Sequence, residues 1–172
     1  MKKNLLFFLF ATASFMIIGF TSSCNKAGEL CFDFAQNTTV NTNAVATPGT
    51  VTVSKTVGSA LYDQLTGKGV KIDQVNTVSV KAITITIPST AGYTFDDIST
   101  AEVTVNSISL GKLPTNATGL TAIFSAPTQS DFKSAFLTNT NSTMNFTATF
   151  KKAVSASTLN IQIPLNTCYQ VL

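Results

Sequence analysis

The feature that most constrains this chain is a series of short runs in which apolar and polar residues alternate. The run 143–150 is the clearest, because Met144, Phe146, Ala148 and Phe150 are separated by Asn and Thr. This alternation has the period of a β-strand, whose successive side chains point to opposite faces. The chain is also rich in Thr, Val and Ile, which suit a pleated sheet. These patterns predict strands at 29–35, 49–56, 77–87, 101–110, 119–125, 143–150 and 157–165, with a possible extra strand near 38–46 and a tail to Leu172.

Seven or eight strands separated by turns predict an all-β fold. We expect a single antiparallel β-sandwich over 29–172, Ig-like with Greek-key connections. Helices are expected only as short connectors. One is predicted over 60–66, capped by Ser59, and the other over 129–137, capped by Thr128.

Two of the expected strands change the parity of their apolar residues part of the way along. In 77–87 the change falls at Lys81-Ala82, and in 101–110 it falls between Val105 and Ile108. A strand whose buried set changes parity usually contains a bulge or bends from one sheet to another. We therefore expect a bulge or a bend in both strands.

The first 23 residues have the three parts of an export signal. Lys2-Lys3 supply the positive charge, Leu5–Phe20 form an apolar run, and Thr21-Ser22-Ser23 are small residues in front of Cys24. The apolar run is shorter than the roughly 20 residues that cross a bilayer comfortably. We therefore predict that residues 1–23 are a removed signal peptide and not a membrane span.

With these residues the chain resembles the small lipobox-anchored β-sandwich lipoproteins of Bacteroidetes envelopes. The resemblance implies that the Cys24 thiol is lipidated and that the protein is held at the bacterial outer membrane. Residues 24–28 would form a short tether, because the five residues that follow Cys24, Asn25 to Glu29, span at most about 17 Å. Asn25-Lys26-Ala27-Gly28 departs from the acidic stretch that resembles a surface-export signal in this phylum, so the periplasmic face and the cell surface both stay open. The alternative is an ordinary secretory signal beside a chance cysteine.

Two further cysteines, Cys31 and Cys168, lie near opposite ends of the exported part. An even number of cysteines in an exported protein favours a disulfide. Cys31 alternates with the apolar residues of its strand, and Cys168 does the same if the last strand continues beyond residue 165. Both would then point outward, and a bridge could join neighbouring terminal strands. The alternative is two free buried thiols.

Composition excludes several classes of function. All 11 basic residues are Lys, and removal of the signal leaves nine of them against eight acidic residues. Without clustered Arg and Lys we expect no nucleic-acid partner. The chain has no His, which is the commonest general base and metal ligand, and we expect neither enzymatic activity nor a cofactor.

Two weak candidate sites remain. Asp96 and Asp97, in a loop before the strand that contains Glu102, offer oxygen ligands for calcium, although such a pair more often caps a turn. Phe132 and Phe136, spaced i and i+4 in the predicted second helix, could contact an apolar ligand.

Together these observations favour a non-enzymatic envelope lipoprotein that serves as a binding or structural module. Because the tether is short, we expect a partner at the membrane and the role of an accessory subunit of an outer-membrane protein complex. A carrier of an apolar small molecule or lipid is the first alternative, and an adhesin-like surface module is the second.

Overall fold

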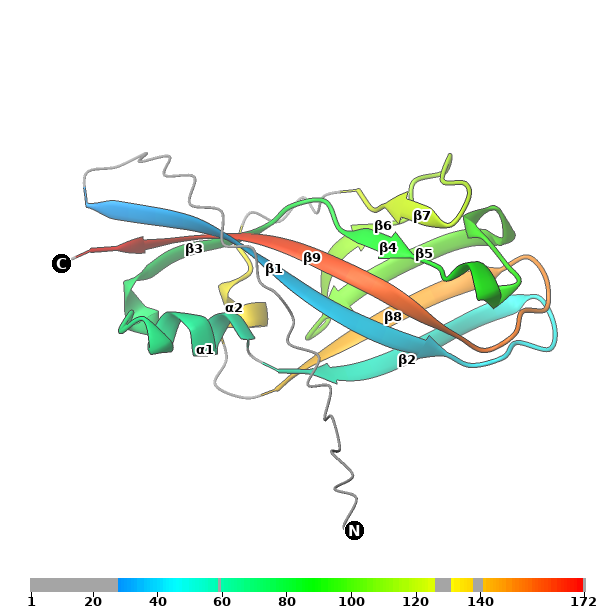
Figure 1. Cartoon of the computed structure of the whole chain (residues 1–172), viewed down its shortest axis with the longest axis horizontal. Helices are drawn as coiled ribbons and strands as arrows, with labels where there is room; N and C mark the ends of the chain where they lie inside the picture. Colours follow the sequence, from blue (N-terminus) through cyan, green and yellow to red (C-terminus); the bar gives the residue numbers. More distant parts are fainter. Residues whose placement is uncertain (1–27, 59, 126–130, 138–140, 172) are drawn as a thin grey trace, which may run out of the picture.

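Two antiparallel sheets pack face to face in the computed structural model, which describes residues 28–58, 60–125, 131–137 and 141–171 (Figure 1). This confirms an all-β sandwich. The first sheet has the order β1-β9-β4-β7 with β3 also paired to β9, and the second has the order β2-β8-β5-β6. The described part holds nine strands, more than the seven or eight expected. Their bounds are β1 Glu29–Thr42, β2 Gly49–Val57, β3 Val75–Val80, β4 Thr84–Thr86, β5 Ile98–Val105, β6 Ile108–Lys112, β7 Thr121–Ile123, β8 Ser142–Phe150 and β9 Ser157–Gln170.

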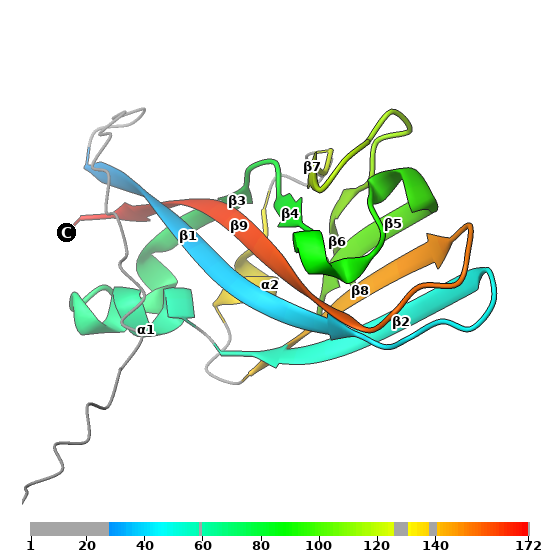
Figure 2. The same cartoon turned by 45° about the vertical axis from the view of Figure 1, so that its right-hand side comes forward.

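The longest elements are β1 and β9, which pair along their whole length. The register runs from Glu29 opposite Gln170 to Thr42 opposite Ser157, and the two strands cross the molecule diagonally (Figures 1 and 2). The runs expected separately at 29–35 and 38–46 therefore belong largely to one strand. β9 continues beyond the expected end at residue 165. This extension brings the two ends of the described chain together.

A proline in the central strand explains the parity change at Lys81-Ala82. Val80 at the end of β3 lies opposite Leu165, whereas Thr84 at the start of β4 lies opposite Gln162. Four steps on one side therefore match three on β9, so one extra residue bulges out. Pro164 lies opposite this gap, where its carbonyl accepts a hydrogen bond from the Lys81 amide at 2.9 Å. Proline has no amide hydrogen, so Pro164 can accept a backbone hydrogen bond from the neighbouring strand but cannot donate one, and the regular pairing is interrupted there. The predicted bulge is confirmed.

The second parity change has a different cause, and the expectation of one bent strand over 101–110 is wrong. β5 ends at Val105 and β6 begins at Ile108, so the two form a hairpin. Asn106 and Ser107 at its tip have φ values of 48° and 67°. Two consecutive positive φ values are typical of the type I′ turn, which matches the twist of hairpin strands. Asn106 also accepts a hydrogen bond from the Thr143 amide at 3.0 Å, which ties the turn to β8.

The core lies between the sheets and follows the predicted alternation. In β8, Met144, Phe146, Ala148 and Phe150 are all buried, as expected. Leu159, Ile161, Ile163 and Leu165 of β9 face them from the other sheet and are buried as well. At one end the rings of Phe95 and Phe124 meet edge to face, with centroids 6.3 Å apart. The alternating residues thus form one continuous core.

The helices are short connectors, as expected. α1, Ala60–Gly67, buries Leu61 and Leu65. α2, Lys133–Phe136, is shorter than the predicted 129–137. The expected caps Ser59 and Thr128 lie outside the described residues. Three single-turn 3₁₀ helices complete the described elements: Ile72–Gln74, Ser89–Ala91 and Phe95–Asp97.

A buried hydroxyl in β9 offers a test of the packing. Thr167 is fully buried, and its Oγ1 has no hydrogen-bond partner in the described part of the chain. An unsatisfied buried polar group costs about 1–3 kcal/mol. Thr167→Val keeps the shape and removes the hydroxyl, so we expect the free energy of unfolding to rise by roughly 1 kcal/mol.

Chemical denaturation measures this change, and Thr42→Val is the matched control. Thr42 is also buried, but its Oγ1 accepts from the Ser157 amide at 3.2 Å and donates to the Ser157 carbonyl at 3.1 Å. Its substitution is expected to destabilise the protein. If both variants lost stability to a similar degree, Thr167 would not be the unsatisfied group.

Candidate functional site

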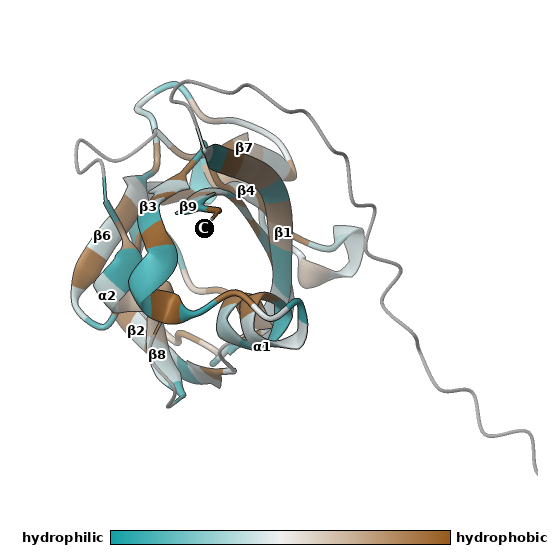
Figure 3. Ribbon diagram, turned by 90° about the vertical axis from the view of Figure 1, so that its left-hand side faces the viewer, coloured by the Kyte–Doolittle hydropathy of each residue, from teal (hydrophilic) through white to brown (hydrophobic). Residues whose placement is uncertain are grey.

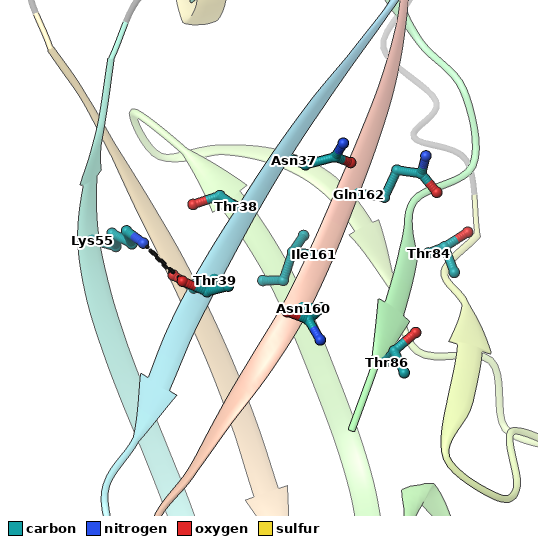
Figure 4. Close-up of a pocket in the computed structure, with 9 residues that line it drawn as sticks. All are labelled: Asn37, Thr38, Thr39, Lys55, Thr84, Thr86, Asn160, Ile161 and Gln162. Carbon is teal, nitrogen blue, oxygen red and sulfur yellow. Dashed lines mark hydrogen bonds between the residues drawn. The ribbon is translucent and has the colours of Figure 1, made fainter. Parts of the chain in front are cut away.

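The outer face of the first sheet carries an open hollow of about 610 Å³. Its floor is formed by strands β1, β9 and β4, and β2 borders it on one side (Figure 4). Side chains alternate along each strand, so most residues of the hollow lie between the core positions, while Thr38 and Ile161 occupy inner-facing positions of the two paired strands. The lining residues are Asn37, Thr38, Thr39, Lys55, Thr84, Thr86, Asn160, Ile161 and Gln162.

The lining contains one charged group, the ammonium of Lys55. This Nζ donates to the Thr39 carbonyl at 2.5 Å and to the Thr39 hydroxyl at 3.2 Å. The Thr39 carbonyl therefore points away from β9, toward β2. β1 is an edge strand, and unpaired edge carbonyls can recruit foreign strands. Lys55 covers one of these carbonyls and joins the two sheets.

The amide side chains of the hollow are not used in the fold. Those of Asn37, Asn160 and Gln162 make no hydrogen bond with another described residue, and all three are exposed. Each amide group can donate and accept hydrogen bonds. The hollow therefore presents neutral polar groups to a ligand, and no carboxylate or thiol lines it.

The outer face of the second sheet is polar too, but there the polar groups satisfy one another. Thr50 and Thr149 are hydrogen-bonded at 2.7 Å, and Thr52 and Thr147 at 2.9 Å. In the next pair, Ser54 donates to Asn145 at 2.7 Å. These cross-strand pairs stabilise the sheet. The outer face of the first sheet also has such pairs outside the hollow, where Thr158 donates to Asn41 at 2.8 Å and Asn166 donates to Asp33 at 2.9 Å. The amides around the hollow differ from these groups in having no partner among the described residues.

The predicted calcium candidates have structural roles. The Asp96 carboxylate accepts from the Gly119 amide and the Thr94 hydroxyl, both at 2.9 Å. These hydrogen bonds, the Gly119 bond first, lower the pKa of Asp96. Asp97 accepts from the Thr94 amide at 3.0 Å and pairs with Lys152 at 3.0 Å. Burial alone would raise the pKa of Asp97, but these two partners outweigh it, and the pKa is lowered.

Glu102 does not join the two aspartates. It lies within β5 and faces Lys112 at 4.0 Å. In the described part, the group of three potential metal ligands whose ligand atoms lie within 4.8 Å is a different one, formed by Glu29, Cys31 and Cys168. Asp96 and Asp97 therefore brace a loop and cap a 3₁₀ turn, the more common role of such a pair.

The candidate ligand contacts Phe132 and Phe136 are core residues. Phe132 is fully buried and Phe136 is 5% exposed. The Phe132 amide donates to the Val78 carbonyl at 2.7 Å, which fixes the start of α2 against β3. Both rings fill the sandwich under the helix, and this arrangement does not favour a carrier of apolar ligands.

The structure confirms the disulfide between Cys31 and Cys168. The two residues are direct partners in the β1–β9 register, and their Cα atoms are 4.0 Å apart. In an antiparallel pair, such close approach is typical of non-hydrogen-bonded positions. Val171 donates to the Gly28 carbonyl across the two strands, whereas the Thr39 carbonyl accepts from Lys55 and points away from β9. Even residues of β1 therefore form backbone hydrogen bonds with β9, and odd residues do not. Cys31 is an odd residue and lies at a non-hydrogen-bonded position.

Sequence reasoning missed the hollow. Its signal was present, because Asn37 in β1 and Asn160 and Gln162 in β9 occupy the polar positions of two strands that pair. The pairing itself could not be read from the alternation. Cys24 lies outside the described residues. In the part of the chain that the structure describes, neither helix combines the length and the apolar character needed to cross a bilayer.

Comparison with known proteins assigns no family. No family model matches the chain, and no curated protein matches its sequence. One similar solved structure is a chain of Desmodium yellow mottle tymovirus, 12% identical, in an alignment that covers 81% of this chain and 89% of that one. Its TM-score is 0.24, too low for an argument about fold or function. The function must therefore be argued from the residues themselves.

Proposed function

We propose that this protein is a non-enzymatic, lipid-anchored module of the bacterial outer membrane that binds a protein partner through the hollow on its first sheet. The observation that carries the proposal is the contrast between the hollow and the polar surface outside it. Elsewhere on the two outer faces, hydroxyls and amides pair with one another. Around the hollow, three amide side chains have no hydrogen-bond partner among the described residues. Unpaired amides can exchange water for a partner's peptide groups without breaking a bond of the fold.

The chemistry of the hollow supports a binding role. General acid-base catalysis and nucleophilic catalysis need a titratable or nucleophilic side chain in contact with the substrate. Lys55 is the basic side chain of the lining, and its ammonium donates hydrogen bonds to the Thr39 carbonyl and to the Thr39 hydroxyl, so it acts there as a donor and not as a base. Amides and hydroxyls instead give orientation and specificity to a neutral polar surface. The N-terminal sequence supports the anchor, with Lys2-Lys3, an apolar run and small residues before Cys24.

The test is capture of a partner by variants of the two faces. Asn160→Lys places a long charged side chain in the centre of the hollow, and Thr52→Lys places the same side chain on the exposed outer face of β2. We expect wild type and Thr52→Lys to recover the same envelope protein from detergent-solubilised membranes after cross-linking. Asn160→Lys is expected to recover it at least tenfold less, because the new charge must be desolvated.

Circular dichroism and thermal melting would establish that both variants are folded. Equal recovery by both variants would contradict the assignment of the hollow. Failure of the wild type to recover any envelope protein would contradict the binding function as a whole. Recovery of polysaccharide in place of protein would favour the adhesin-like alternative.

A further inference from the structure

One end of the molecule exposes apolar side chains that continue the core pattern. Leu30 near the start of β1 is 42% exposed, and Val171 just after β9 is 45% exposed. Leu30 lies directly opposite Tyr169 in the register, and the Val171 amide donates to the Gly28 carbonyl at 2.7 Å. By strand alternation, Leu30, Tyr169 and Val171 share the inner face of the first sheet. Tyr169 is half-buried, with its ring centre 6.2 Å from that of Phe32, and the two exposed residues flank it. We call these three residues the terminal patch.

The terminal patch is exposed because the first sheet is longer than the layer that covers it. Both sheets overlap over one half of the molecule, while the start of β1 and the end of β9 project beyond the second sheet (Figures 1 and 2). α1 and α2 both lie in this half of the molecule (Figures 1 and 3). Phe32 is still covered there, with the Lys68 ammonium 5.2 Å from its ring centre. Among the described residues of this face, Leu30 is the next one toward the end of the sheet, and its side chain is exposed.

The distance from the anchor to this end is short. Three residues, 25–27, lie between Cys24 and Gly28, and the four steps from one Cα atom to the next limit the span to about 14 Å. A lipid on Cys24 would lie at the bilayer surface, so the start of β1 could not be far above the headgroups. The end of β9 would be held at the same height, because Val171 is bonded to Gly28.

We propose that the terminal patch docks on the lipid surface and sets the orientation of the sandwich; this inference rests on the proposed anchor at Cys24. Leu and Val side chains enter the boundary between headgroups and acyl chains, and the Tyr169 ring suits that depth. Three side chains recruit a protein to a membrane only weakly. So short a tether, however, raises their effective concentration at the surface, so that a weak contact is enough to orient the domain.

This orientation limits the height of the hollow. Asn37 lies seven residues after Leu30 along β1, so the hollow would lie at most about 23 Å from the terminal patch at 3.3 Å per residue. Because the terminal patch is on the inner face of the first sheet and the hollow is on its outer face, the hollow would not face the bilayer and would stay open to the extramembrane part of a neighbouring membrane protein.

The chain has no tryptophan, so single-tryptophan variants report one position each. Leu30→Trp probes the terminal patch. Ile123→Trp on β7 is the matched control, because Ile123 is an exposed apolar residue, at 62%, in the other half of the molecule. Each lipidated variant would be reconstituted into phosphatidylcholine vesicles with brominated acyl chains. We expect bromine to reduce the fluorescence of Leu30→Trp at least twofold, with a blue-shifted emission, and to leave Ile123→Trp almost unchanged. Val171→Trp should behave like Leu30→Trp.

Equal quenching at both positions, or quenching of Ile123→Trp alone, would overturn the proposal. The mass of the N-terminal peptide separates this failure from failure of the anchor. Acylated protein without quenching of Leu30→Trp or Val171→Trp would overturn the docking surface and leave the lipoprotein assignment intact. A mass without acyl chains would overturn the anchor, and with it this inference.

Discussion

Cys24→Ser is expected to move the protein from the membrane fraction to the soluble fraction. One acyl chain gives only marginal, reversible binding, whereas two or more anchor a protein stably. The apolar surface of the described part is too small to replace them, since its exposed large apolar residues are Leu30, Leu120, Ile123 and Val171. Loss of the modified thiol should therefore abolish stable attachment almost completely.

Fractionation of cells with detection of the protein in each fraction measures this shift, and uptake of labelled fatty acid measures acylation directly. Ser23→Ala is the matched control, because it keeps a small residue before Cys24 and should leave both readouts unchanged. The lipoprotein assignment would be wrong if the Cys24→Ser protein still sedimented with membranes and the wild type incorporated no label.

Cys31→Ser/Cys168→Ser is expected to lower the free energy of unfolding by about 3–5 kcal/mol. The bridge closes a loop with a sequence separation of 137 residues, and in the chain-entropy model such a long loop is near the upper end of the effect. For a domain of this size the melting temperature should fall by roughly 10 °C. The sandwich should remain folded, because the two inner faces form one large core.

Differential scanning calorimetry measures this change, with reduction of the wild type by a dithiol as a second route to the same state. The reductant should not alter the melting temperature of the double variant, which controls for effects of the reagent. Equal melting temperatures for oxidised wild type and double variant would mean that the bridge does not contribute to stability.

The sequence pattern predicted the strands correctly where apolar and polar residues alternate without interruption from one end of the strand to the other. The alternation in 143–150 located β8 and its buried face because that strand is regular from end to end. The same parity argument placed Cys31 and Cys168 on one face, and their pairing followed once the terminal strands were assumed to be neighbours. Length was harder to predict, since β1 continues through 36–42, where polar residues interrupt the apolar pattern.

Two features lay beyond local pattern. The parity change after Val105 is a tight turn, but Asn106-Ser107 lacks the glycine that usually marks a type I′ hairpin. The hollow depends on which strands become neighbours, since Asn37 and Gln162 are far apart in the chain and opposite each other in the sheet. Long-range pairing of this kind is set by the whole core. No local rule places those amides together.

The position of the disulfide has a mechanical consequence. In a chain held by a lipid at Cys24, any force on the domain enters through Gly28 into β1. β1 is an edge strand that pairs only with β9 among the described strands. A force applied at its first residue would therefore break the β1–β9 hydrogen bonds one after another, starting from that end. The third residue pair from that end is Cys31 with Cys168. The disulfide at this position would stop β1 from separating further from β9. The force would then be transmitted to β9, which is paired with strands on both of its sides.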